Sequence, residues 1–105
     1  MAPSAQSVGT RAAIDARRTE IDAVLGRYHA SNPRLFGSVA RGDATTTSDI
    51  DVLVDLEPEA GNPLLRLAGL GEELSRLLDA RVDVVAPELL RDPVARSAMS
   101  DAVAL

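Results

Sequence analysis

The sequence has 105 residues, the size of one domain, and we predict a single domain over residues 1–105. Sixteen acidic residues against eleven basic ones give a formal charge of −5, which argues against binding nucleic acid through its phosphates, so no direct nucleic-acid partner is expected. The absence of cysteine excludes disulfides and thiolate metal sites. No apolar run is long enough to span a bilayer and no signal segment opens the chain, so we expect a cytoplasmic protein without a membrane partner.

The first third of the chain predicts one long helix followed by a short strand. Residues 1–7 are small and polar and predict a flexible terminus. Apolar residues at helical spacing then predict a helix over residues 8–30. Residues 31–33 (Ser-Asn-Pro) predict a turn, after which residues 34–36 form a short strand.

The rest of the chain predicts two further strands around a helix. A strand is expected over residues 49–56, an amphipathic leucine-rich helix over 64–79 and a third strand over 81–86. Asp92-Pro93 indicates the start of a last helix, which runs to about residue 104. This order predicts an α/β (α+β) fold with helices on both sides of a small mixed β-sheet.

The strand over residues 49–56 carries alternate carboxylates. Because successive side chains point to opposite faces, its aliphatic face is expected to be buried and its other face to look outward. On the outward face, Asp49 and Asp51 have Cα atoms about 6.6 Å apart, so both can bind one hard cation or two neighbouring ones. Oxygen ligands alone favour magnesium or manganese over zinc. Leu53 and Asp55 share this face, but Asp55 is about 13 Å from Asp51 and is assigned to solvent or to a structural pair.

A glycine-serine turn precedes this strand. Gly37 permits close approach of the backbone to a phosphate, and Ser38 offers a hydroxyl and an N–H. Carboxylates that bind metal beside such a turn suggest a nucleotide site. Arg41 either adds positive charge to a bound triphosphate or forms a structural ion pair with a loop carboxylate such as Asp43.

Asp83 lies within the otherwise aliphatic third strand. A carboxylate there is costly to bury unless it has a partner or a metal. Two interpretations follow from its spacing: Asp83 is a solvated residue on the exposed face, or it joins Asp49 and Asp51.

Three short segments together resemble a known signature. Gly37-Ser38, Arg41-Gly42 and Ser48-Asp49-Ile50-Asp51 are similar to the GSxxRG…SDxD motif of the polymerase-β-like nucleotidyltransferase superfamily. Within it, the chain resembles the minimal nucleotidyltransferases, which are antitoxins paired with HEPN-type ribonuclease toxins. The resemblance covers residues 35–86. It departs at Asp79-Ala80-Arg81, where relatives often have a glycine turn.

The resemblance implies the minimal nucleotidyltransferase fold and a nucleotidyl-transfer site. It implies that Asp83 supplies the third carboxylate and that two Mg²⁺ ions, or Mn²⁺, are held by Asp49, Asp51 and Asp83. It also implies ATP as the substrate. The expected nucleotide-binding residues are Gly37, Ser38, Arg41 and Ser48.

The resemblance also implies a partner. The expected function is transfer of AMP from ATP to a hydroxyl, a tyrosine in the family, of a cognate HEPN-type toxin. One alternative is a non-catalytic antitoxin that masks the toxin by binding. Another is a small-molecule nucleotidyltransferase of the aminoglycoside-modifying kind, although such enzymes usually carry an added helical domain.

Overall fold

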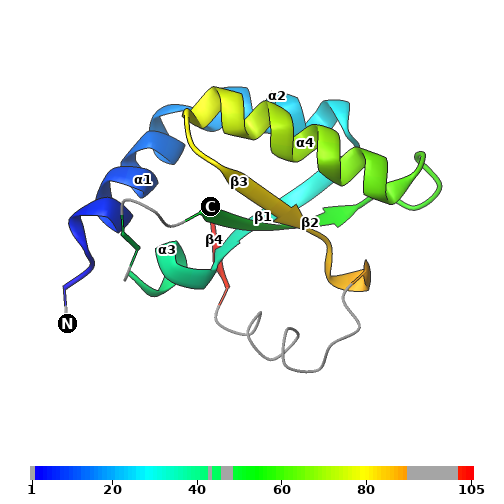
Figure 1. The fold of residues 1–105 in the computed structure, drawn as a ribbon. Coiled ribbons are helices and arrows are strands. Elements are labelled where there is room, and N and C mark those ends of the chain that lie inside the picture. The colour runs from blue at the N-terminus through cyan, green and yellow to red at the C-terminus, as the bar shows by residue number, and fades with distance from the viewer. Residues whose placement is uncertain (1, 43, 46–48, 90–101) are drawn as a thin grey trace.

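A computed structural model of the chain describes residues 2–42, 44–45, 49–89 and 102–105. These residues form a four-stranded sheet in the order β3-β2-β1-β4. β1 is antiparallel to β2 and to β4, and β2 is parallel to β3, so the predicted mixed sheet is confirmed. Figure 1 shows the sheet below the longer helices. The strands are β1 (Ala30–Phe36), β2 (Ile50–Leu56), β3 (Val82–Val85) and β4 (Val103–Ala104), and the helices are α1 (Ala5–Ala16), α2 (Arg18–Arg27), α3 (Gly37–Arg41), α4 (Pro63–Leu78) and the 3₁₀ helix η1 (Pro87–Leu89).

The single helix predicted over residues 8–30 is two helices. Arg17, with φ −109° and ψ 16°, ends α1 and precedes α2. The apolar spacing continues through this break, because Ile14 and Ile21 are both 2% exposed and both reach the same core. The periodicity therefore reported the buried side but not the bend in the backbone.

The prediction of a flexible terminus over residues 1–7 is wrong for its last part. Ser4 caps α1, with its Oγ accepting from the N–H of Ser7 at 3.1 Å and donating to the carbonyl of Ala44 at 2.7 Å. The Ser4 N–H donates to the carbonyl of Gly42 at 2.7 Å. Ser7 is 1% exposed and its Oγ accepts from the N–H of Ala44 at 3.0 Å. These bonds tie the start of the chain to the loop after α3.

The predicted turn at residues 31–33 is an irregularity inside β1. Strand pairing with β2 begins at Ala30, and the register shifts between Ser31 and Arg34. Asn32 has φ +51°, a conformation that asparagine tolerates better than most residues. The breaker residues therefore bend the strand without ending it.

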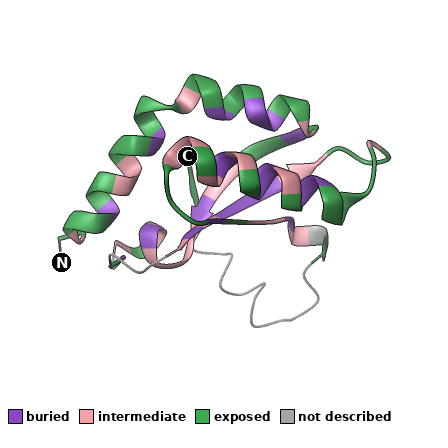
Figure 2. Cartoon of the chain, turned by 45° about the horizontal axis from the view of Figure 1, so that its top comes forward, coloured by how far each residue is buried: buried purple, intermediate pink, exposed green. Residues whose placement is uncertain are grey.

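The core lies on one face of the sheet. Apolar side chains from α1, α2 and α4 pack in one cluster with side chains from β1, β2 and β3, and Figure 2 shows the buried residues along the sheet and the inner sides of these helices. α1, α2 and α4 therefore share a single side of the sheet, and most of the last helix that the sequence predicts lies outside the described residues. The fully buried members include Leu35, Val54 and Leu70.

Leu53 departs from the predicted exposure of the opposite face. The sequence places it outward with the carboxylates, but it is only 1% exposed. β2 is a central strand, and Leu53 has a register partner on each side, Arg34 on β1 and Val85 on β3. Alternation assigns a residue to one face of the sheet but does not report how far that face is covered.

α4 connects the parallel strands β2 and β3. It begins with Asn62, whose side chain accepts from the N–H of Leu65, and with Pro63 in its first turn. It ends at Asp79, which has φ +50° and ψ 45°. This is the left-handed conformation that glycine usually supplies at a helix end, and aspartate tolerates it. Asp79 thus makes the turn for which the sequence has no glycine.

Arg66 joins three elements at the far end of the sheet. It is 9% exposed, and its guanidinium donates to the carbonyls of Tyr28 at 2.9 Å, His29 at 2.7 Å and Glu57 at 3.0 Å. The ends of α2 and β2 are thereby fixed to α4.

The C-terminal helix predicted from residue 92 to about 104 lies mostly outside the described residues. Its last part is wrong, because Val103 and Ala104 form β4 and pair with Leu35 and Arg34 of β1. Among the described residues, the structure has no helix long and apolar enough to cross a membrane.

Candidate active site

The carboxylates of two neighbouring strands meet on one face of the sheet. β2 and β3 are parallel and in register, with Asp51 opposite Asp83. Side chains at paired positions of adjacent strands point to the same face, with the strands about 4.8 Å apart. Asp83 is exposed and also lies beside Asp51. The two interpretations of Asp83 are therefore compatible: it is a solvated strand residue within the carboxylate group.

The glycine turn lies directly against this group. Gly37 has φ +70°, and a Cβ built on it would lie 2.4 Å from Oδ2 of Asp51. A real side chain does not fit at that distance. Gly37 follows Phe36, which pairs with Asp51 across β1 and β2, so the strand register fixes the turn beside the carboxylate.

The electrostatic surroundings of Asp51 are unfavourable to its charge. Partial burial is the largest cause that raises the pKa of Asp51 above its ordinary value, followed by the negative charges of Asp83 and Asp49. Arg41 acts in the opposite direction and lowers the same pKa. The site concentrates negative charge that a cation would relieve.

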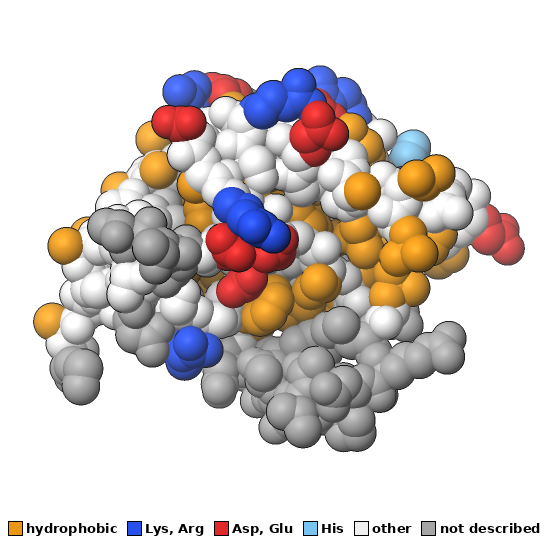
Figure 3. All heavy atoms as spheres, viewed as in Figure 1, with side chains coloured by type: hydrophobic (Ala, Val, Ile, Leu, Met, Phe, Trp, Pro, Cys, Tyr) orange, Lys and Arg blue, Asp and Glu red, His pale blue; other side chains and the backbone are white. Residues whose placement is uncertain are grey.

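Arg81 is a residue of the site that the sequence interpretation missed. Its Nε lies 3.6 Å from Oδ2 of Asp49, with side-chain exposures of 77% and 39% for the two residues. The Arg81 carbonyl also accepts from the N–H of Ile50 at 2.9 Å, which places Arg81 opposite Asp49. Figure 3 shows acidic and basic side chains meeting near the middle of this face, below α4. Aligning the predicted third strand with the second so that Asp83 lies opposite Asp51 would have placed Arg81 opposite Asp49.

Among the residues that the structure describes, no three histidine, cysteine, aspartate or glutamate side chains form a ready-made metal-binding group. Asp49 is instead engaged by Arg81. The chemistry of the donors still matches a hard divalent cation, because the neighbouring groups are carboxylates and the repulsion among them raises the pKa of Asp51.

The other predicted nucleotide-binding residues lie around the turn. Ser38 is half-buried in α3. Arg41 is exposed in the last turn of α3, where its charge acts on Asp51. Ser48 and Asp43 lie outside the described residues, as does any pairing of Arg41 with Asp43.

Asp55 is in phase with the site carboxylates but belongs to a different group. Its Oδ1 lies 2.7 Å from the guanidinium of Arg34, and its Oδ2 accepts from Asn32 at 3.0 Å. The expectation of a solvated or structurally paired Asp55 is confirmed.

Carboxylates on two neighbouring strands beside a glycine turn, on a small mixed sheet, define the class of nucleotidyl-transferring enzymes. The family model of the nucleotidyltransferase domain matches residues 31–105, and the chain belongs to this family. The resemblance carried by Gly37-Ser38 and the aspartate pair is thereby confirmed.

Curated relatives are similar over about three quarters of their length. Protein adenylyltransferase MntA of Thermococcus cleftensis is 39% identical over 77 residues, which cover 73% of this chain and 76% of the relative. MJ0126 of Methanocaldococcus jannaschii, to which the same activity is assigned, is 36% identical over 76 residues, covering 71% of this chain and 74% of the relative.

Solved structures share the fold. A structure described as a minimal nucleotidyltransferase has a TM-score of 0.71 and 40% identity, and the match covers 88% of this chain and 92% of that one. The predicted minimal nucleotidyltransferase fold is confirmed by this likeness. A toxin–antitoxin structure with AMP-PNP has a TM-score of 0.65 at 23% identity, covering 82% of this chain and 69% of that one, and this likeness concerns the fold.

Proposed function

We propose that this chain is an antitoxin that transfers AMP from ATP to a hydroxyl, a tyrosine by analogy with the family, on a cognate HEPN-type toxin. The register of Asp51 opposite Asp83, with Asp49 immediately before β2, is the observation that carries the proposal. A protein acceptor is supported by relatives named as protein adenylyltransferases. A toxin partner is supported by the fold neighbour described as a toxin–antitoxin complex with AMP-PNP.

Asp49, Asp51 and Asp83 would hold two magnesium ions, or manganese in their place. Such ions, when bound, neutralise charge on the triphosphate and lower the pKa of an attacking hydroxyl. The carboxylates provide the oxygen ligands that these ions prefer. Arg81 holds Asp49 in the structure and would release it to the metal.

The residues of the turn would position the triphosphate. Gly37 leaves room for a phosphate beside Asp51, Ser38 offers its hydroxyl and N–H, and Arg41 adds positive charge. The acceptor oxygen would attack the α-phosphorus, forming one O–P bond while the bond to the oxygen shared with the β-phosphate breaks. Pyrophosphate leaves, and Asp83 accepts the proton of the hydroxyl.

Mass spectrometry of the toxin encoded beside this chain tests the proposal. After incubation with this chain, ATP and magnesium, we expect the toxin to gain mass in units of AMP. The double variant Asp49→Ala, Asp51→Ala should not produce the gain. Asp55→Asn is the matched control, since Asp55 occupies the same strand face but pairs with Arg34, and this variant should retain transfer.

The same experiment separates two other functions. A stable complex with the toxin and no mass gain would indicate an antitoxin that acts by masking. Transfer to an aminoglycoside, with none to the toxin, would indicate a small-molecule enzyme.

A further inference from the structure

The outer edge of β3 is open in the described sheet. β3 is the first strand in the order β3-β2-β1-β4 and so has a neighbour on one side. The N–H of Ile50 donates to the carbonyl of Arg81, and in a parallel pair alternate residues of a strand direct their backbone groups to the same neighbour. Arg81 and Asp83 therefore direct theirs to β2, whereas Val82 and Val84 direct theirs to the open edge.

The backbone groups of Val84 on this edge are available for another strand. The Val82 N–H donates to Oγ of Ser75 at 2.9 Å. In the part of the chain that the structure describes, the Val82 carbonyl and the N–H and carbonyl of Val84 have no hydrogen-bond partner. Val84 thus presents one donor and one acceptor side by side, which is what an added strand needs for pairing.

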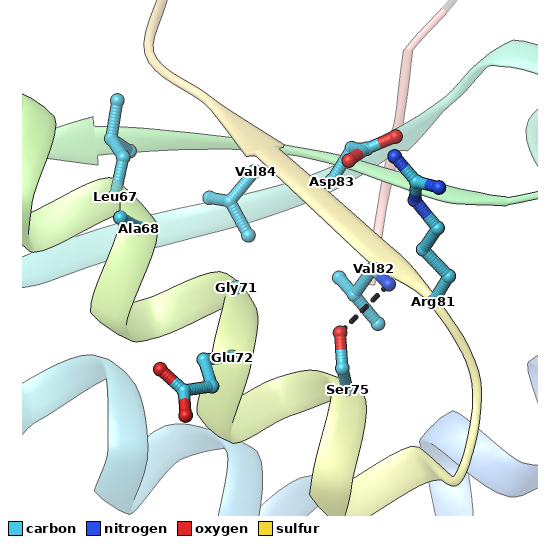
Figure 4. Close-up of a pocket in the computed structure, with 9 residues that line it drawn as sticks. All are labelled: Leu67, Ala68, Gly71, Glu72, Ser75, Arg81, Val82, Asp83 and Val84. Carbon is cyan, nitrogen blue, oxygen red and sulfur yellow. Dashed lines mark hydrogen bonds between the residues drawn. The ribbon is translucent and has the colours of Figure 1, made fainter.

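A groove of about 360 Å³ runs beside this edge, between α4 and β3. On the side of the groove formed by α4, three of the lining residues have small side chains or none: Ala68, Gly71 and Ser75. A Cβ on Gly71 would lie 3.3 Å from the carbonyl oxygen of Val82, so even a methyl group there would crowd the edge. In Figure 4, Val84 points toward α4, and Asp83 points to the other side of the strand.

We propose that the acceptor protein docks on this edge: an extended segment adds to β3 as a further strand and brings its hydroxyl side chain to Asp83. The inference rests on the proposed transfer to a protein. A residue paired with Asp83 would share its face, with Cβ atoms about 5 Å apart. The residues on either side of it would point into the groove, where Ala68 and Gly71 leave room for small apolar side chains. Backbone pairing supplies affinity and the alternate side chains supply specificity.

The charges favour an acceptor over a second copy of this chain. Pairing of β3 with β3 of another copy would bring both Asp83 carboxylates to one face, and each chain carries a formal charge of −5. Like charges at opposed strand positions destabilise such a pair. An acceptor with a hydroxyl at that position has no such repulsion.

Two variants test the docking without changing the carboxylates. Val84→Pro removes the N–H on the open edge, where proline is tolerated because that group has no partner in the sheet. Ala68→Trp fills the groove from an exposed helical position, and Ala23→Trp, at an exposed position on α2, is its matched control. AMP transfer is measured to the toxin encoded beside this chain and to N-acetyl-tyrosinamide, a small acceptor that needs no strand pairing.

We expect Val84→Pro and Ala68→Trp to lower transfer to the toxin at least about tenfold, the effect of losing one or two hydrogen bonds or their alignment. Transfer to N-acetyl-tyrosinamide should stay unchanged, and Ala23→Trp should match the wild type with both acceptors. Unchanged transfer to the toxin in a folded Val84→Pro and in Ala68→Trp would overturn the docking alone. If Val84→Pro does not fold, transfer to the toxin by Ala68→Trp alone tests the docking.

Two further outcomes are distinguishable. A wild type that transfers AMP to neither acceptor would refute the proposed function together with the docking. A wild-type dimer in light scattering that becomes a monomer in Val84→Pro, with transfer to the toxin intact, would assign the edge to a second copy and overturn the proposal.

Discussion

Gly37 and Asp51 are so close that the carboxylate takes the space of a side chain: a Cβ on Gly37 would lie 2.4 Å from Oδ2 of Asp51. We expect Gly37→Ala to displace this carboxylate and to strain a backbone with φ +70°, costing about 1 to 2 kcal/mol of stability. A misplacement of about 1 Å at a reacting centre can lower the rate about 100-fold. AMP transfer should therefore fall by roughly that factor. Steady-state transfer assays and urea unfolding measure the two effects.

Gly26→Ala is the matched control for this variant. Gly26 lies in α2, and a Cβ built on it has nothing within 4 Å. Replacing a helical glycine by alanine there should stabilise the protein by up to about 1 kcal/mol and leave transfer unchanged. Equal activities of Gly37→Ala and Gly26→Ala would contradict the role of the turn.

Asp51 should make stability depend on pH. Its folded pKa is raised above the ordinary value of 3.8, chiefly by burial and then by Asp83 and Asp49. Stability should therefore fall as pH rises from the unfolded pKa through the folded pKa, and the loss is complete above the folded value. Asp51→Asn should be more stable than the wild type at neutral pH, with a difference that shrinks toward pH values below both pKa values. Thermal unfolding between acid and neutral pH measures this difference.

Magnesium should oppose the same repulsion. Without nucleotide, millimolar Mg²⁺ should raise the melting temperature of the wild type, since an ion that binds only the folded state stabilises it. Asp51→Asn should gain much less. An equal rise in melting temperature in the wild type and in Asp51→Asn would show that the ion binds away from Asp51.

Arg81 should compete with the proposed metal for Asp49, because its Nε lies 3.6 Å from Oδ2 of that residue. Both side chains are well exposed, so the pair contributes no more than about 0.5 kcal/mol to stability. Arg81→Ala should leave the melting temperature nearly unchanged and tighten Mg²⁺ binding about two- to threefold in calorimetric titration. Arg17→Ala, which removes a similarly exposed pair with Glu20, should leave Mg²⁺ binding as it was. Weaker Mg²⁺ binding in Arg81→Ala would show that Arg81 supports the site instead of competing for it.

Arg66 should contribute strongly to stability. Its guanidinium donates to three carbonyls, and the residue is 9% exposed. Arg66→Met would remove the donor to the Tyr28 and Glu57 carbonyls and would leave the His29 carbonyl with the Glu57 N–H alone. We expect a loss of at least about 2 kcal/mol in the free energy of unfolding. Arg76→Met, on the exposed side of the same helix with Glu72, should change stability by less than about 0.5 kcal/mol. Similar losses in both variants would refute the role of the carbonyl contacts.

The sequence predicted β2, β3 and α4 well because these elements follow strong periodic patterns. Alternation placed Asp49 and Asp51 on one face, and the structure keeps both carboxylates near Asp83. Proximity between strands is a long-range property, however, so the pairing of Arg81 with Asp49 was not visible within either segment.

The remaining errors come from features that the spacing of apolar residues does not report. The bend at Arg17 leaves the apolar period intact, and the Ser4 and Ser7 contacts depend on a loop about 40 residues away in the sequence. Leu53 is buried on the face of the carboxylates, and alternation assigns a residue to a face without reporting how far that face is covered.

The parallel pairing of β2 and β3 also orders the assembly of the site in time. Gly37 and Asp51 belong to antiparallel neighbours that are close in sequence, so their contact can form early in folding. Asp83 reaches Asp51 only after α4 has crossed from one strand to the next, and such non-local pairings are slow to form. Folding intermediates, and chains still emerging from the ribosome, would therefore hold the glycine turn and two carboxylates before the third arrives. Nucleotidyl transfer would begin only with the completed sheet.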